Sequence, residues 1–311
     1  MEDTNQTDMN GFILLGLSTV PYLQAIFFIL FLLMYIVTLL GNASLIVAVT
    51  LNPQLQTPMY FFLTNLALID ICFSSTIVPQ LLVNTLSKLK RISQMGCATQ
   101  MFISLVLGAT ECLLLAVMAF DRYAAICKPL HYHVIMNQRL CFCLATSCWL
   151  ICIINSLTHV NLIFRLSFCG VNQVNHYFCE VPPFLQISCS DTWFNTIMMY
   201  ISALTIGMCS FILTLFSYVH IISTILQTHS SEGRHKTFST CSSHLIVVSL
   251  YYCPIMSMYL RPHSDYSPET DKTISILYTA VTPMFNPIIY GIRNKQVIGT
   301  IKAVITRQRQ E

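Results

Sequence analysis

An Asp-Arg-Tyr triplet, Asp121-Arg122-Tyr123, stands where a long apolar segment meets a basic loop that contains proline. Charged side chains inside a membrane-spanning segment cost free energy, so they are rare and usually functional. The triplet alone leaves two interpretations open. It is either an interfacial ion pair that only ends a helix, or an ion pair that serves a function.

Two further acids, Asp70 and Glu111, fall inside other apolar segments. A buried carboxylate pairs with another group, binds a cation or takes up a proton. One hypothesis is that both acids form a sodium-like ion site with Asn286. The alternative, equally open, is a hydrogen-bonded and protonated structural pair.

The sequence holds no constellation typical of catalysis, such as a nucleophile with its base or a glycine-rich phosphate loop. Cys141, Cys143, Cys148 and Cys152 are clustered, but their spacing is not that of a zinc site. No internal repeat of the kind found in transporters is visible. We therefore expect no enzyme, no cofactor and no metal.

Composition indicates the class of protein. Of the 311 residues, 55% are hydrophobic and only 9% are charged, against roughly 25% charged residues in soluble domains. This balance predicts an integral membrane protein surrounded by lipid. The net charge of +3 is small and dispersed, so nucleic acid is not an expected partner.

Seven apolar segments reach the ~20 residues that a spanning helix needs. The expected fold is an all-α membrane protein, a seven-transmembrane helix bundle over residues 23–291. We predict its helices near 23–50, 58–86, 97–125, 140–163, 194–227, 237–260 and 273–291. In the tail, Val297, Ile301, Val304 and Ile305 fall on one helical face, which predicts a short amphipathic helix on the membrane surface.

Lys and Arg are unevenly divided between alternate loops. One set of loops holds nine, namely Lys128, Arg139, Arg234, Lys236, Arg293, Lys295, Lys302, Arg307 and Arg309; the other holds six, namely Lys88, Lys90, Arg91, Arg165, Arg261 and Lys272. Because basic residues are in excess in cytoplasmic loops, the set of nine should be cytoplasmic. We expect a multi-pass plasma-membrane protein with residues 1–22 extracellular and residues 292–311 in the cytoplasm.

Two features of the sequence agree with an extracellular N-terminus. Asn5 begins an Asn-Gln-Thr glycosylation sequon. Cys97 lies at the outer end of the third helix, and Cys169, Cys179 and Cys189 lie in the long outer loop. Four extracellular cysteines imply two disulfides, but they allow three pairings, and their positions do not choose among them.

Five motifs, taken in order along the chain, resemble those of one receptor family. They are LQTPMYFFL at 55–63, MAFDRYAAICKPLHY at 118–132, Ser217-Tyr218, KTFSTCSSH at 236–244 and PMFNPIIYGIRNK at 283–295. As a set they are similar to the olfactory receptors of the tetrapod type, within the rhodopsin-like G-protein-coupled receptors.

The resemblance implies a receptor for a small, mostly apolar, volatile odorant, which activates a stimulatory heterotrimeric G protein and so raises cAMP. It implies the disulfides Cys97–Cys179 and Cys169–Cys189. It also implies that one set of residues serves G-protein coupling and activation: Asp121, Arg122, Tyr123, Tyr218, Asn286, Pro287 and Tyr290. The alternatives are a non-olfactory chemosensory receptor of the same superfamily and a membrane transporter.

The outer half of the bundle should hold the ligand. On the third helix, residues at i, i+3, i+4 and i+7 share a face, and other helices contribute further residues to a hypothetical pocket. The set is Met101, Ser104, Leu105, Gly108, Ser202, Ala203, Ile206, Tyr252, Ile255, Tyr259 and Thr279. It is apolar with a few hydroxyls and has no charge to pair with a cationic ligand. The alternative is that many of these residues only pack helix against helix.

Overall fold

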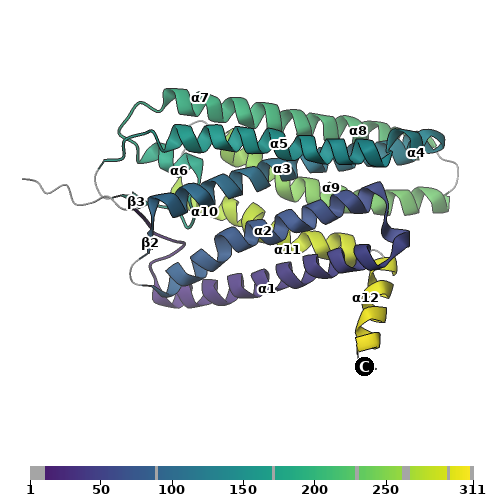
Figure 1. Ribbon diagram of the computed structural model, residues 1–311, viewed down its shortest axis with the longest axis horizontal. Coiled ribbons are helices and arrows are strands. Elements are labelled where there is room, and N and C mark those ends of the chain that lie inside the picture. The colour runs from purple at the N-terminus through teal and green to yellow at the C-terminus, as the bar shows by residue number, and fades with distance from the viewer. Residues whose placement is uncertain are drawn as a thin grey trace, which may run out of the picture.

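The computed structural model describes residues 11–87, 90–169, 172–227, 231–260, 267–292 and 295–308. Long helices lie side by side in one bundle (Figure 1). Large apolar side chains cover its outer surface, among them Leu40, Phe142 and Phe216, each more than half exposed. Such a surface suits lipid, in which only closed hydrogen-bonded structures such as helices are stable. The predicted glycosylation site Asn5 lies outside the described residues.

Seven spans form the bundle, which is therefore the predicted seven-helix fold. In the part of the chain that the structure describes, six helical segments are long and apolar enough to cross a membrane: α1 (Pro21–Leu51), α2 (Pro58–Leu86), α3 (Gln94–Cys127), α5 (Gln138–Ile163), Trp193–Gln227, and the part of α9 (Ser231–Tyr259) from Cys241. The seventh span is a run of short helices, α10 (Pro268–Ile276), η5 (Leu277–Val281), α11 (Thr282–Pro287) and η6 (Ile288–Ile292). Boundaries differ most from expectation at α9, which begins at Ser231 rather than near 237.

Local sequence explains where several helices begin. Ser93 and Asn137 precede α3 and α5, and their side-chain oxygens accept hydrogen bonds from the backbone N–H groups of Gly96 (3.0 Å) and Leu140 (2.9 Å). These bonds satisfy donors that the first helical turn leaves free. Proline opens α2 at Pro58, where the missing N–H costs nothing.

The fifth and seventh spans contain π-helical turns that the periodicity of the sequence did not predict. The fifth span runs from α7 (Trp193–Ser202) through the π-helix η3 (Ala203–Met208) into α8 (Cys209–Gln227), and η5 and η6 are also π-helical. Each π-turn adds a residue to the helical repeat and rotates the side chains that follow. A count based on 3.6 residues per turn therefore loses register there.

A small sheet closes one end of the bundle, which we call the strand end. Its strands are β1 (Phe12–Leu14), β2 (Arg91–Ile92) and β3 (Gln173–Val174), in the order β2-β1-β3, with β1 antiparallel to β2 and parallel to β3. Both disulfides lie at this end and have the pairing that the resemblance implies, Cys97–Cys179 and Cys169–Cys189. The loop that carries them also contains the short helix α6 (Val181–Gln186).

The opposite end, which we call the α12 end, carries the tail helix α12 (Lys295–Gln308) and the short helix α4 (Tyr132–Ile135). In Figure 1, α12 turns away from the long axis of the bundle. Val297 is 1% exposed and packs with Leu45 and Leu55, while Ile301 lies partly buried beside them. The side chains of Val304 and Ile305, predicted on the same face, lie outside the described residues.

Loss of the Cys97–Cys179 disulfide should prevent normal maturation. Both cysteines are fully buried, and the bridge spans 82 residues of sequence; removing a native disulfide typically costs about 2–5 kcal/mol. We expect Cys179→Ser to reduce cell-surface labelling severalfold, and the Cys97→Ser/Cys179→Ser double variant to be no worse than either single one. Cys253→Ser, at an exposed free cysteine, is the control. Normal surface labelling of Cys179→Ser would contradict this assignment.

Candidate functional site

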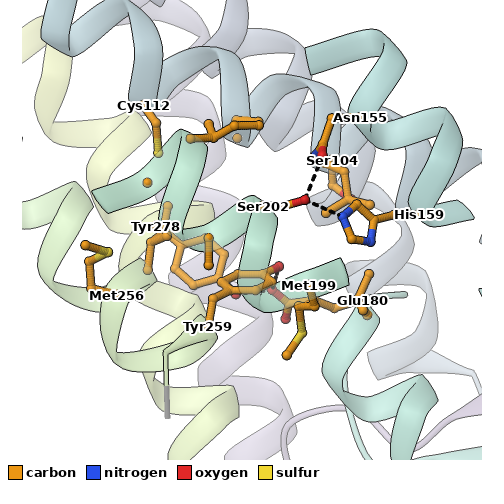
Figure 2. A pocket seen from close by; sticks show the side chains of 18 of the residues that line it. Ser104, Cys112, Asn155, His159, Glu180, Met199, Ser202, Met256, Tyr259 and Tyr278 are labelled. Atoms are coloured by element: carbon orange, nitrogen blue, oxygen red, sulfur yellow. Dashed lines mark hydrogen bonds between the residues drawn. The ribbon is translucent and has the colours of Figure 1, made fainter. Parts of the chain in front are cut away.

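A cavity of about 110 Å³ lies toward the strand end, between α3, α5, α7, η3 and α9, and beneath the outer loop (Figure 2). Its walls are mostly apolar, and its volume limits an occupant to a small molecule. Eight of the eleven residues predicted for the pocket line it: Ser104, Leu105, Gly108, Ser202, Ala203, Ile206, Ile255 and Tyr259. Three of the four residues predicted on α3 line the cavity, as do all three predicted on the fifth span.

Three predicted pocket residues lie outside the cavity wall. Tyr252 is fully buried. Its hydroxyl donates to the Cys112 carbonyl oxygen (2.6 Å) and lies 2.9 Å from Ser210 Oγ, so the neighbouring Tyr251 lines the cavity instead. Met101 is buried in an apolar cluster under the outer loop. Thr279 is bonded to the Tyr177 hydroxyl (2.8 Å) and faces that loop.

Two polar residues of α5, Asn155 and His159, belong to the wall although the sequence did not indicate them. Ser202 Oγ donates to Asn155 Oδ1 (2.7 Å), and His159 Nε2 lies 2.8 Å from the same Oγ. Figure 2 shows the three side chains meeting at Ser202. The spacing of four residues between Asn155 and His159 was the available signal, because it places both on one helical face.

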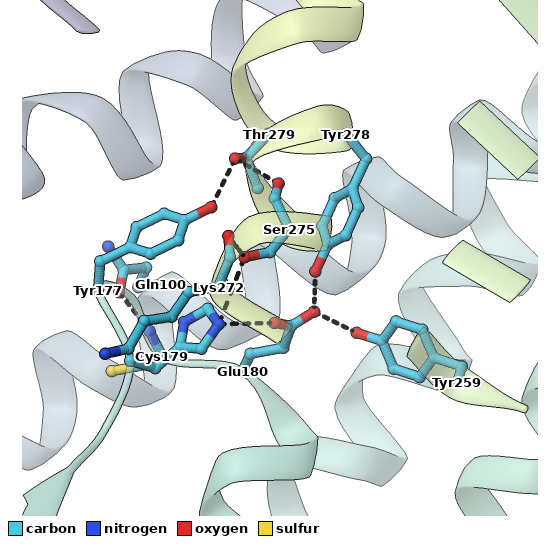
Figure 3. A network of polar contacts seen from close by, with 10 residues as sticks. Gln100, Tyr177, Cys179, Glu180, Tyr259, Lys272, Ser275, Tyr278 and Thr279 are labelled. Carbon is cyan, nitrogen blue, oxygen red and sulfur yellow. Dashed lines mark hydrogen bonds and ion pairs between the residues drawn. The ribbon is translucent and has the colours of Figure 1, made fainter. Parts of the chain in front are cut away.

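The cavity also contains an acid, which corrects the prediction of an uncharged pocket. Glu180 follows Cys179 in the outer loop, is 4% exposed and lines the cavity. Its Oε1 accepts hydrogen bonds from the hydroxyls of Tyr259 (2.9 Å) and Tyr278 (2.5 Å) (Figure 3). Glu180 was missed because it reaches the bundle from a loop, and helical periodicity says nothing about loops.

Other polar contacts hold the loop against the seventh span. His176 Nε2 lies 3.7 Å from Glu180 Oε2 and 3.4 Å from Ser275 Oγ. Burial and the nearby Lys272 lower the pKa of His176 to about 3, so it stays neutral. Burial raises the pKa of Glu180 to about 7; the two tyrosine hydrogen bonds oppose that shift and Asp271 adds to it.

At the α12 end, the predicted pair of Asp121 and Arg122 is formed. Arg122 Nη2 lies 2.7 Å from Asp121 Oδ2, and Asp121 is fully buried. The Tyr132 hydroxyl donates to Asp121 Oδ1 (2.8 Å), so both carboxylate oxygens have partners. Tyr123 lies beside this pair and packs its ring near His220. Tyr132 is a further member of the site, within the motif that first drew attention to it.

Tyr218 meets a residue that the sequence did not single out. Its hydroxyl lies 2.7 Å from Nδ1 of His244, the last residue of the KTFSTCSSH motif, and both side chains are buried. Arg122 interacts electrostatically with both of them. The Tyr290 hydroxyl is buried nearby and has no hydrogen-bond partner among the described residues.

The candidate ion site lies between these two regions. Asn286 Nδ2 donates to both oxygens of Asp70, at 3.1 and 2.9 Å. Glu111 is fully buried and acts electrostatically on Asp70, but neither of its carboxyl oxygens has a hydrogen-bond partner in the part of the chain that the structure describes. Pro287 packs against α1 so closely that a Cβ at Gly41 would lie 2.8 Å from its ring.

Comparison with known proteins identifies relatives over nearly the whole chain. The family model described as "Olfactory receptor" matches residues 31–308. Olfactory receptor 5AP2 of Mus musculus is 47% identical over 306 residues, which cover 98% of this chain and 96% of that protein. Olfactory receptor 10A7 of Homo sapiens is 48% identical over 304 residues, with the same coverage of each chain.

Stability should depend on pH through Glu180. Its pKa rises on folding from 4.5 to about 7, so in this interval the folded protein holds a proton that the unfolded chain releases. The contribution of Glu180 to stability is therefore greatest below 4.5 and is lost as the pH rises toward 7. Glu180→Gln should flatten the fall of Tm across this interval in detergent-solubilised protein, whereas Glu269→Gln, at an exposed carboxyl, should not. Identical slopes for wild type and Glu180→Gln would refute this reading.

Proposed function

The chain belongs to the olfactory receptor family, and we propose that it binds a small volatile odorant in the cavity beneath its outer loop and activates a stimulatory G protein. It is a multi-pass membrane receptor and not an enzyme. The observation that carries the proposal is the cavity itself. It is small and mostly apolar, and it is lined by residues of six spans together with the disulfide-bonded loop.

In this proposal the strand end is extracellular and the α12 end is cytoplasmic, in the plasma membrane. Disulfides form and persist in oxidising compartments, and both disulfides are at the strand end. The excess of Lys and Arg in loops of the α12 end agrees with this orientation. The cavity then faces the medium that delivers the odorant, and Arg122 faces the cytosol.

The residues at the α12 end would control access of the G protein. In the structure Arg122 is held by Asp121, which in turn accepts a hydrogen bond from Tyr132. Activation would release Arg122 toward the G protein and Tyr218. An odorant drives such a change only by binding the active arrangement more tightly, and a complete shift from 1:99 to 99:1 needs roughly 5.5 kcal/mol of differential affinity. A small ligand should therefore activate only part of the population.

Arg122→Ala should abolish odorant-dependent cAMP while still reaching the cell surface. The substitution removes the group that would contact the G protein and leaves the cavity at the strand end intact. cAMP and surface labelling would be measured together in cells that express a stimulatory olfactory G protein. Arg139→Ala, at an exposed arginine at the start of α5, is the matched control and should respond normally. Full signalling by Arg122→Ala would exclude the proposed role.

We also infer a cation site between Asp70 and Glu111. Two buried carboxylates that lie close together repel each other, so they need either a cation between them or a shared proton. The Glu111 oxygens have no hydrogen-bond partner among the described residues. Asn286 would fix the geometry by holding Asp70. The alternative, a protonated pair, needs no ion.

Sodium dependence separates these alternatives. If the site binds sodium in the inactive arrangement, replacing sodium by a large organic cation should shift the odorant dose curve of the wild type to lower concentrations. The same exchange should leave Glu111→Gln unshifted, because one carboxylate is gone. A wild-type curve that does not move with sodium would favour the protonated pair.

A further inference from the structure

Five hydroxyl groups line the cavity, and each gives its proton to another protein group. Ser104 donates to the Gln100 carbonyl oxygen (2.7 Å) and Tyr251 to the Gly108 carbonyl oxygen (2.7 Å). Tyr259 and Tyr278 both donate to Glu180. The fifth hydroxyl is that of Ser202. A hydroxyl has one proton but two lone pairs, so such oxygens can only accept a further hydrogen bond.

Ser202, Asn155 and His159 form a hydrogen-bonded group, the Ser202 cluster, in which the serine proton is also committed to a protein acceptor. Asn155 Oδ1 is only an acceptor, so the short contact of 2.7 Å uses the Ser202 proton. The contact of 2.8 Å with His159 must then be donated by His159 Nε2–H to Ser202 Oγ. This assigns the imidazole tautomer and commits its proton. Ser202 keeps one lone pair for an occupant of the cavity.

Few donors in the wall remain uncommitted. Among the described residues that line the cavity, the Asn155 amide N–H₂ donates to no other protein group and is free to bind a ligand. The Cys112 thiol is at most a weak donor. Against these stand the lone pairs of the five hydroxyl oxygens. The polar surface of the cavity is therefore dominated by acceptors.

We propose that the cavity selects odorants that carry a hydrogen-bond donor, such as an alcohol, over acceptor-only odorants of the same shape, such as the matching ketone, aldehyde or ether. In the described part of the wall, an acceptor-only oxygen can gain a hydrogen bond only from the Asn155 amide. Placed against the lone pairs elsewhere in the wall, it loses its hydrogen bonds to water and gains none, which is the unfavourable case for a buried polar group. The inference rests on the proposed function, because it concerns ligands of the same cavity.

The test uses sets of probes that differ only in the polar group. One set is octanol, octanal and heptyl methyl ether, which have the same number of non-hydrogen atoms; another is cyclohexanol and cyclohexanone. Binding is read as the rise in Tm of the purified receptor, since a ligand that binds only the folded state stabilises it, and signalling is read as cAMP. One hydrogen bond is worth roughly a 3- to 10-fold change in affinity, so the alcohol should bind at least threefold more tightly than its ether.

A variant of the Ser202 cluster should weaken the preference for ligands that carry a hydrogen-bond donor. Ser202→Ala removes the serine hydroxyl and frees both of its partners, the acceptor Asn155 Oδ1 and the donor His159 Nε2–H. The wall therefore gains a free donor that the wild type lacks. The gap between cyclohexanol and cyclohexanone should narrow or invert in this variant. Ser257→Ala, at an exposed serine of α9 outside the cavity wall, is the matched control and should keep the wild-type preference.

The two readouts separate the failure of this inference from that of the proposed function. Stabilisation by alcohols without any rise in cAMP would support the donor preference and count against G-protein signalling. Equal or stronger stabilisation by ethers and ketones would overturn the donor preference whatever the cAMP response. Failure of every alcohol to raise Tm would overturn it as well, because alcohols are the class that it names.

Discussion

The disulfide between Cys97 and Cys179 is the constraint on which the cavity and the proposed ligand site depend. It holds the outer loop to the first turn of α3 with the two Cα atoms 5.6 Å apart. The next residue along the loop is Glu180, so the covalent bond places a carboxyl group over the cavity, where Tyr259 and Tyr278 reach it. Without the bond, ordering such a loop over the bundle would cost more conformational entropy.

Helix α3 connects every functional region of the molecule. Ser104 and Gly108 face the cavity, Glu111 faces Asp70 one turn further on, and Asp121 lies near the end of the helix. Because a helix is stiff along its axis and its backbone hydrogen bonds are internal, α3 fixes the distances between these regions. The polar groups at its two ends are thus parts of one rigid element, around which the other spans can move.

The sequence was sufficient for much of this arrangement, for reasons that are physical. Apolar length located the spans, and the regular period of α3 located Ser104 and Gly108 in the cavity wall. The sequence was insufficient for choosing between neighbouring residues of a helix and for placing residues in loops. Tyr252 was chosen for the pocket where Tyr251 lines it, since a shift of one residue rotates a side chain by about 100°. Glu180 arrives from a loop whose path depends on long-range contacts, which no local pattern encodes.

The hydrogen bonds of α9 limit how far this helix can move relative to α3, and so limit how a change at the cavity can affect the α12 end. Tyr251 and Tyr252 donate to carbonyl oxygens of α3, at Gly108 and Cys112, and His244 on the same helix meets Tyr218 of α8. Any displacement of α9 away from α3 must therefore break two buried hydrogen bonds and expose their donors, at about 1–3 kcal/mol for each unsatisfied group. An odorant that contacts Tyr251 acts directly on one of them. If the proposed function holds and activation moves α9, its barrier and the ligand contact share the side chain of Tyr251.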